Sequence, residues 1–348
     1  MNQSLITITS GGDPRSQKQS LSPMPKLSEG TATIASYGVI RVSGEDAIGF
    51  LHNQLTHDFT GLGDRQARFS SFCNAKGRIQ ASFIGIKTSP AEVLLVCSTD
   101  LIAQTVKRLS MFVLRSKVKL TDASSQFSLM GVIGKESQLA LSSALCSALS
   151  SQTTPDHFGQ SPWVHWNCAS EAGSCHWISL YPSLGQERFL CICESPVAQD
   201  SITSVAESEW FFSEIMSGVC LVGLPTYESF VPQMINYESV GGVHFQKGCY
   251  PGQEVVARSQ FRGTIKRRGF LVSCEAPLHD GQELFLHSVG EQPCGQIVRA
   301  VAHQGTYYGF ASLVVSATEP PALIHTCAQE PLSLVHVMPP PYSLREDI

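Results

Sequence analysis

The octet "KGCYPGQE" sets Cys249 among residues that could activate its thiol. Lys247 would favour the thiolate, which is the nucleophilic and metal-binding form of cysteine. Gly248 and Gly252 permit a tight turn around the sulfur, and Glu254 could steer a proton or orient the lysine. Cysteines that only fill a core sit in aliphatic runs, and Cys249 does not. It is therefore the candidate reactive residue, and the alternative is a glycine-rich structural turn with an incidental thiol.

Four further residues have the chemistry of a ligand site. Trp210, on an expected helix, and Tyr37, in an expected strand, could stack a flat heteroaromatic ring, although large aromatics more often pack in a core. Gln253 offers amide hydrogen bonds. Arg258 opens a basic run that ends at Arg268 and contains no acid. Such a run is usually a solvated surface, but it could bind a polyglutamyl tail, a phosphate or RNA.

Composition limits the kind of protein. The 348 residues are 43% hydrophobic with a formal net charge of -5, which suits two or three structural units and argues against wholesale nucleic-acid binding. The apolar runs are far shorter than the roughly 20 residues of a membrane span, so no membrane association is expected. Residues 1–30 lack the layout of a targeting signal and predict a flexible arm. Twelve irregularly spaced cysteines favour reduced thiols and a cytoplasmic location.

Strands and helices alternate along residues 31–266 and predict an α+β body. Apolar residues at helical spacing predict a helix that continues to residue 62, with Ser43 and Asp46 as its capping pair. The turn "NAKG" predicts a hairpin over 67–86. Further elements are expected as strands over 91–98, 127–134 and 188–193, helices over 99–114 and 201–218, and a connecting loop over about 150–175.

From residue 267 onward, short strands separated by Pro, Gly and acidic turns predict a small antiparallel barrel. A domain boundary is therefore expected near residue 266, between the body over 31–266 and a barrel domain over 267–348. Residues 218–258 lack sustained periodicity, and a long ordered loop in a compact domain is usually functional. Cys249 lies in this loop beside the domain junction, where ligand sites are common.

Several stretches resemble the YgfZ family, whose signature is K-G-C-Y-x-G-Q-E. The octet itself lies in "FVPQMINYESVGGVHFQKGCYPGQEVVARSQFRGTIKRR" (230–268). The stretches "LHNQLTHDFTGL" (51–62), "FCNAKGRIQASF" (72–83), "SGVCLVGLP" (217–225) and "PPPYSLRED" (339–347) extend the resemblance over nearly all the chain after the arm. The resemblance implies an aminomethyltransferase-like, folate-binding α+β body with a central cavity, followed by a C-terminal antiparallel β-barrel.

The resemblance also implies ligands and partners. Tetrahydrofolate is the implied cofactor, with Trp210 and Tyr37 at the positions of two folate-associated tryptophans, so Tyr37 departs from the family pattern. The implied role is maintenance or assembly of iron-sulfur clusters in client enzymes, including tRNA-thiolating enzymes, with Cys249 as a transient cluster ligand. The expected partners are these client enzymes and cluster-assembly proteins, and direct tRNA contact through the basic run is a further hypothesis.

One departure bears on enzymatic activity. Folate-dependent aminomethyltransferases carry an acidic pair in the second strand of the early hairpin, where this chain has Ala81 and Ser82. The resemblance therefore implies folate binding without methylene transfer by the usual route. Two hypotheses follow: an accessory factor for iron-sulfur proteins, or a folate-dependent one-carbon transferase or thiol oxidoreductase that uses Cys249 as nucleophile.

Overall fold

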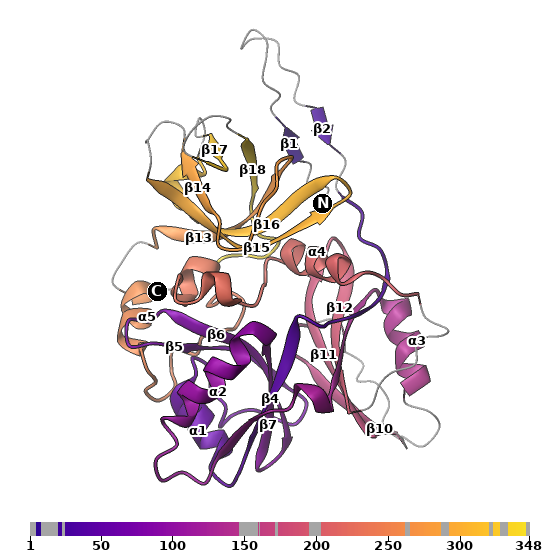
Figure 1. The fold of residues 1–348 in the computed structure, drawn as a ribbon, viewed down its shortest axis with the longest axis vertical. Coiled ribbons are helices and arrows are strands. Elements are labelled where there is room, and N and C mark those ends of the chain that lie inside the picture. The colour runs from indigo at the N-terminus through magenta and orange to yellow at the C-terminus, as the bar shows by residue number, and fades with distance from the viewer. Residues whose placement is uncertain are drawn as a thin grey trace.

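Two five-stranded sheets, a closed six-stranded barrel and a small two-stranded sheet make up the computed structural model of the chain (Figure 1). The predicted α+β body and C-terminal antiparallel barrel are confirmed. The structure describes residues 5–7, 20–22, 25–145, 159, 161–170, 173–194, 203–261, 265–286, 292–319, 323–327 and 333–345.

The first sheet is antiparallel throughout and is built around the predicted hairpin. Asn74 Oδ1 accepts the amides of Lys76 and Arg78 at 2.8 and 3.1 Å, and Gly77 takes the turn's positive φ of 69°, as the sequence "NAKG" predicts. Helices α1 (Ala47–Gln54) and α2 (Ile102–Ser110) contact this sheet. In spatial order its strands are β5 (Ala67–Cys73), β6 (Ile79–Ser89), β7 (Glu92–Ser98), β4 (Tyr37–Ser43) and β8 (Lys119–Asp122).

The helix predicted to run to residue 62 is shorter than expected. It ends at Gln54, because Leu55 is extended and forms an isolated antiparallel bridge with Phe72 of β5. Phe59 and Leu62 are buried, but from a loop, so their spacing reflects core packing and not helix. The predicted capping pair is also wrong: the Asp46 carboxylate makes no cap bond and accepts the amide of Lys117 instead.

The second sheet corrects the expectation of a loop over 150–175. The segment His165–Ser170 is strand β10, and β11 begins at Gly173. Trp166 and Cys168 alternate along β10 and are buried opposite Trp177 and Cys175 of β11; that alternation was the missed strand signal. In spatial order the strands are β10, β11 (Gly173–Ser183), β12 (Gln186–Cys193), β9 (Ser128–Ile133) and β3 (Gly30–Thr33), with helix α3 (Lys135–Leu145) against β9 and β12. Residues 150–158, 160, 171 and 172 of the expected loop lie outside the described residues.

Cys168 is an exception to the expectation of reduced thiols, because it is disulfide-bonded. Ten other cysteines in the described part of the chain are free, and Cys249 is the exposed one among them.

Helix α4 (Glu207–Ser217) lies between the second sheet and strands of the barrel (Figure 1). It ends at Gly218, which takes the left-handed conformation with φ 71°. The segment after it is mostly loop, as predicted, with short 3-10 helices at Leu224–Thr226 and Pro232–Ile235. One α-helix in it was not anticipated: α5 (Gln253–Phe261) begins directly after the Cys249 turn.

The barrel's first strand begins at Arg267. In order round the barrel its strands are β13 (Arg267–Cys274), β16 (Thr306–Val314), β15 (Pro293–His303), β14 (Glu283–Leu286), β17 (Ile324–His325) and β18 (Leu334–Met338). Remaining short elements are the 3-10 helices Thr99–Leu101, Ser124–Gln126 and Val315–Ala317, and the paired strands β1 (Leu5–Thr7) and β2 (Ser20–Ser22), which lie within the expected arm. No helix in the described part of the chain is long and apolar enough to cross a membrane.

A buried ion pair joins the barrel to the body. Arg268 of β13 binds the Glu238 carboxylate, and both side chains are withdrawn from solvent. Its guanidinium also donates to the backbone carbonyl of Arg345, at 3.2 Å, in the C-terminal tail. The neighbouring Arg267 donates to the carbonyls of Cys294 and Pro293 at 3.3 and 3.4 Å. Two cations of the basic run are therefore engaged within the protein.

Candidate functional site

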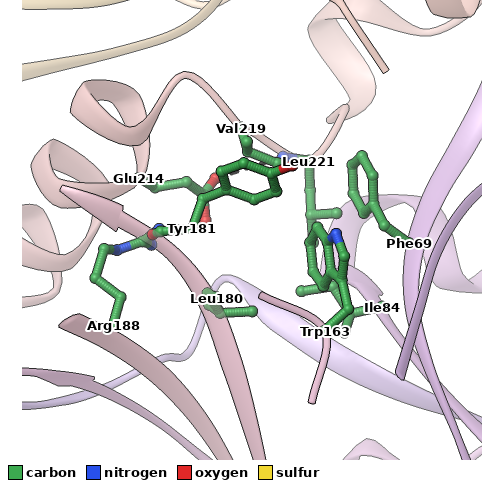
Figure 2. Close-up of a pocket in the computed structure, with 9 residues that line it drawn as sticks. All are labelled: Phe69, Ile84, Trp163, Leu180, Tyr181, Arg188, Glu214, Val219 and Leu221. Carbon is green, nitrogen blue, oxygen red and sulfur yellow. Dashed lines mark hydrogen bonds between the residues drawn. The ribbon is translucent and has the colours of Figure 1, made fainter. Parts of the chain in front are cut away.

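Strands of both body sheets contribute to a partly open pocket with an enclosed volume of about 20 Å³. Its walls are mainly apolar and aromatic, and two ionisable side chains, Arg188 of β12 and Glu214 of α4, reach into it (Figure 2). The lining residues are Phe69, Ile84, Trp163, Leu180, Tyr181, Arg188, Glu214, Val219 and Leu221. Apolar walls with a few convergent polar groups are the usual composition of a small-molecule site.

Trp163 forms one aromatic wall. Its ring stacks on Phe69 with centroids 5.0 Å apart and planes 3° apart, and Tyr181 meets it edge-on at 6.0 Å. The indole Nε1–H donates to the carbonyl of Val240 at 2.9 Å, so the ring is fixed in place. The backbone of Trp163 has a φ of 65°, which a bulky residue rarely adopts and which concentrates at functional sites.

Glu214 supplies a buried carboxylate. Both of its oxygens accept the Tyr37 hydroxyl, at 2.6 and 2.7 Å. Burial raises the pKa of the Glu214 carboxyl, and the Arg299 and Arg188 guanidinium groups oppose that rise. Each carboxylate oxygen has two lone pairs, so the group keeps capacity for further donors.

Arg188 supplies a buried cation beside that carboxylate. Its Nε donates to Ser213 Oγ at 2.8 Å, and its Nη1 donates to Ser217 Oγ and the Tyr181 carbonyl at 3.2 and 3.3 Å. Its Nη2 is buried and has no hydrogen-bond partner among the described residues. A buried donor without a partner is costly, so this nitrogen is suited to an acceptor that a ligand would bring.

Trp210 and Tyr37, predicted to stack a ligand ring, lie behind the pocket and not in its lining. One indole face of Trp210 packs on Gly131, where a Cβ would come within 2.3 Å of the ring. The Arg188 guanidinium lies 4.4 Å from the ring centroid. Tyr37 holds Glu214 through its hydroxyl. The two aromatics therefore support the two charged groups that reach the pocket.

Cys249 lies outside the pocket lining, exposed on the turn before α5. The Lys247 ammonium donates to the backbone carbonyls of His52, Leu55 and Gly248, and its Nζ lies 4.6 Å from the Tyr250 ring centroid. Burial lowers the pKa of Lys247 to about 8, and attraction to Asp58 and Cys249 opposes that shift. The structure thus brings Lys247 and Cys249 into electrostatic contact, as the sequence suggests.

Gln253, Glu254 and Arg258 all lie on α5 and outside the pocket lining. The sequence suggested that Glu254 could orient Lys247, but in the structure it does not. Its carboxylate instead pairs with Arg258 at 3.1 Å, one helical turn away, with both side chains exposed. An exposed pair of this kind contributes little to stability, and it engages Glu254 with Arg258 in place of Lys247.

His52 and Asp58, which sequence reasoning missed, lie beneath the Cys249 turn. His52 Nδ1 and Asp58 Oδ1 are 2.8 Å apart. A Cβ on Gly248 would lie 3.3 Å from His52 Nε2, so the turn rests on this ring. Partial burial disfavours the charged carboxylate, but hydrogen bonds from Thr60, Gly61 and His52 hold the pKa of Asp58 well below its usual range. Both residues come from "LHNQLTHDFTGL", a stretch that carried the apolar spacing and part of the family resemblance but from which no site residue was predicted.

Ala81 and Ser82, in place of the transferase's acidic pair, are buried in β6. The Ser82 hydroxyl accepts the amide of Val222 at 2.8 Å. Ser82 lies two residues before Ile84, so the two side chains share a face of the strand, and Ile84 lines the pocket. The carboxylate missing from this position would therefore have been on the pocket side of the sheet.

Four pocket residues were missed: Trp163, Tyr181, Arg188 and Glu214. Two carried a usable signal. Glu214 is the one carboxylate in the apolar run "WFFSEIM", and Arg188 precedes the apolar "FLCIC"; charges are rarely fully buried unless they are paired. Trp163 lies in the segment that was predicted as a loop, and Tyr181 follows that segment. The two side chains meet only because the segment forms part of a sheet, which was not predicted.

Lys247→Met should slow alkylation of Cys249 by iodoacetamide about two- to fivefold at pH 7, the range expected for a partly exposed charge pair. The cation favours the thiolate only while it is protonated, so the difference should be present below the Lys247 pKa of about 8 and vanish as the pH rises through it. Lys247→Arg should retain most of the wild-type rate, and Lys119→Met, an exposed lysine of β8, should not change it. Equal rates for Lys247→Met and wild type across the pH range would contradict the assignment.

Comparison with known proteins places this geometry in context. The family model described as the GCVT N-terminal domain matches residues 28–165. A tRNA-modifying protein YgfZ from Edwardsiella ictaluri is 30% identical over 322 residues, covering 87% of this chain and 89% of that protein. Proteins of the same name from Colwellia psychrerythraea (27% identical, covering 70% of this chain and 71% of that protein) and Cronobacter sakazakii (26%, covering 90% and 93%) also match.

A solved structure shares the fold. The glycine cleavage system aminomethyltransferase T from Bartonella henselae superposes with a TM-score of 0.64, covering 91% of this chain and 87% of that one, at 14% identity. Identity this low bears on architecture alone.

Proposed function

The chain belongs to the YgfZ family, and from that premise we propose that it is a tetrahydrofolate-binding accessory protein that supports iron-sulfur enzymes, among them enzymes that thiolate tRNA. Its relatives are named tRNA-modifying proteins, and its fold is that of an aminomethyltransferase. The observation that carries the proposal is the pocket, in which Glu214 and Arg188 lie beside aromatic walls.

The pocket's polar groups suit the pterin end of a folate. The pyrimidine edge of a pterin presents an amino group, a ring N–H and a carbonyl in sequence. In the proposed complex the Glu214 carboxylate accepts the two donors and Arg188 Nη2, which has no partner among the described residues, donates to the carbonyl. Trp163 and Tyr181 would contact the flat ring. The enclosed volume of the pocket is about 20 Å³, so lining side chains would have to move to admit the pterin, and the glutamate tail would extend out of the pocket.

The iron-sulfur cluster is cargo in this proposal and not a resident cofactor. A cluster takes about four thiolate ligands. Among the residues that the structure describes, no group of three or more His, Cys, Asp or Glu side chains could hold a metal ion. Cys249 can therefore contribute one cluster ligand only in a complex with a protein that provides the rest.

An alternative function is one-carbon transfer or thiol oxidoreduction with Cys249 as nucleophile. The thiol is exposed and lies near the Lys247 ammonium, which favours such reactivity. Transfer by the usual route is disfavoured because Ala81 and Ser82 replace the acid, and because Cys249 does not line the pocket. Turnover of a labelled one-carbon folate by the purified protein would establish this alternative.

Titration of tetrahydrofolate, followed by tryptophan fluorescence, tests the proposal. Trp163 is the tryptophan in the pocket wall, so we expect saturable quenching in the wild type. Trp163→Phe keeps an aromatic wall and should bind with similar affinity by calorimetry but lose most of the fluorescence change. Trp166→Phe, in the separate core beneath α3, should retain it. A wild type that shows no binding by either method would refute folate binding.

A further inference from the structure

An exposed apolar tip stands between α2 and β8. Its four residues, Met111 to Leu114, include three of the seven exposed large hydrophobic side chains in the described part of the chain: Met111 is 70% exposed, Phe112 44% and Leu114 87%. Aliphatic side chains exposed singly need no explanation, but several in one short segment mark an interaction site.

The Met111–Leu114 tip is an ordered structure. Its four amides donate to the carbonyls of Arg108, Leu109, Ser110 and Phe112 at 3.0 to 3.2 Å. The Phe112 ring also meets the buried Phe72 ring edge-on, with centroids 6.2 Å apart. A tip whose backbone is already fixed loses little entropy when a partner covers it.

Cations surround the tip. From Lys107 to Lys119 the chain has Lys107, Arg108, Arg115, Lys117 and Lys119 and no acidic residue. Lys117 pairs with Glu45 at 2.7 Å, whereas Lys107 and Arg115 are exposed and form no ion pair among the described residues. The protein as a whole is negative, so this segment is a local positive region with an apolar centre.

The tip is linked to the Cys249 turn through Phe72. Phe72, which Phe112 contacts, forms the backbone bridge to Leu55, and the Leu55 carbonyl accepts the Lys247 ammonium at 3.1 Å. The tip and the thiol therefore adjoin the same end of β5.

We propose that the Met111–Leu114 tip is the docking surface for the client protein whose iron-sulfur cluster Cys249 transiently ligates, and that the client presents an apolar pocket with an acidic rim. This inference rests on the proposed function, because it takes a protein as the thiol's partner. RNA is disfavoured as occupant: its bases stack on aromatic rings and guanidinium groups, whereas the most exposed side chains here are aliphatic and Phe112 is turned toward Phe72.

The test uses a strain that lacks its own family member and measures thiolated nucleosides in its tRNA by mass spectrometry. Met111→Ser/Leu114→Ser should lower complementation about tenfold, as expected for the loss of an interface anchor, and Lys107→Glu/Arg115→Glu should also lower it. Leu139→Ser, which removes an exposed leucine of α3, should complement fully. Full complementation by both tip variants would refute the proposal.

A cross-linking arm identifies the occupant. With p-benzoyl-L-phenylalanine in place of Leu114, irradiation in cells should yield an adduct with an iron-sulfur protein, and a short bismaleimide should join that same protein to Cys249. The adduct should be lost in Lys107→Glu/Arg115→Glu. An adduct with lipid, with tRNA or with a second copy of the chain would overturn the proposal.

Two measurements separate failure of the docking surface from failure of the proposed function. The tip variants should bind tetrahydrofolate with wild-type affinity and keep the wild-type rate of Cys249 alkylation. Cys249→Ser in the same strain tests the proposed function itself, whatever the tip variants do.

Discussion

Cys249→Ser is expected to abolish recovery of iron-sulfur enzyme activity in a strain that lacks its own family member, while the purified variant keeps the fold and the tetrahydrofolate affinity of the wild type. Serine has nearly the shape of cysteine but is neither a soft metal ligand nor a thiolate nucleophile at neutral pH. The side chain is exposed and outside the pocket lining, so its free energy of unfolding should change by less than about 0.5 kcal/mol.

Cys327→Ser is the matched control, because Cys327 is a half-exposed cysteine of the barrel region. It should complement as well as the wild type. In cells, the activity of the iron-sulfur client enzyme and the amount of thiolated nucleosides in tRNA measure complementation. In vitro, urea unfolding measures the free energy of unfolding and calorimetry measures the tetrahydrofolate affinity. A Cys249→Ser strain that recovers fully would show that the thiol has no essential chemistry and that the octet is a structural turn.

Glu214→Gln is expected to weaken tetrahydrofolate binding about ten- to a hundredfold, the range for loss of charge-assisted hydrogen bonds to two ligand donors. The amide keeps the volume of the carboxylate and an oxygen that can accept the Tyr37 hydroxyl, so the pocket should persist. Isothermal titration calorimetry is the measurement, with Glu136→Gln, an exposed carboxylate of α3, as control. Equal tetrahydrofolate affinities for Glu214→Gln and wild type would show that the Glu214 carboxylate does not bind the ligand.

The same variant should be more stable than the wild type without ligand. Burial raises the pKa of Glu214 in the folded state above its pKa in the unfolded state. The contribution of the Glu214 carboxyl to folding stability is therefore fully present at pH values below the unfolded-state pKa. That contribution is lost as the pH rises through the folded-state pKa. Above that pH the wild type holds a buried charge that glutamine does not, so the free energy of unfolding of Glu214→Gln should exceed that of the wild type there. A gain in stability with a loss of affinity is the expected signature of a binding group.

Local patterns predicted much of this architecture. The hairpin turn at "NAKG", the helix-strand alternation of the body and the short strands from Arg267 each follow from turn residues and periodicity. Two errors have different causes: in the first, apolar spacing that reports burial was taken for helix, and in the second, polar composition outweighed an apolar alternation that indicates a strand. Phe59 and Leu62 are buried from a loop, and Trp166 and Cys168 belong to a strand where polar composition had suggested a loop.

The Cys249 turn could be predicted from the sequence more readily than the pocket. Cys249 and Lys247 are two residues apart, so their electrostatic contact is a local matter. The pocket instead brings together Trp163, Arg188 and Glu214 from separate elements, and only the paired sheets determine that they meet. Tyr37 and Trp210 were identified as ligand aromatics, and the structure places them one layer behind, in contact with the carboxylate and the guanidinium.

The thiol and the pocket are thus two sites with different chemistry. Cys249 is exposed on a turn and suited to a protein client, whereas Glu214 and Arg188 are buried and suited to a small molecule. In the proposed account, folate occupies the body while the sulfur chemistry takes place at the surface, and neither requires transferase activity.

A crystal structure of the protein with a stable reduced folate, such as 5-formyltetrahydrofolate, tests this account most directly. The account predicts the pterin in contact with Trp163 and Tyr181, with its amino group and ring N–H on the Glu214 carboxylate and its carbonyl on Arg188, and the Cys249 thiol free of contact with the ligand. A pterin bound elsewhere, above all one in contact with Cys249, would contradict it.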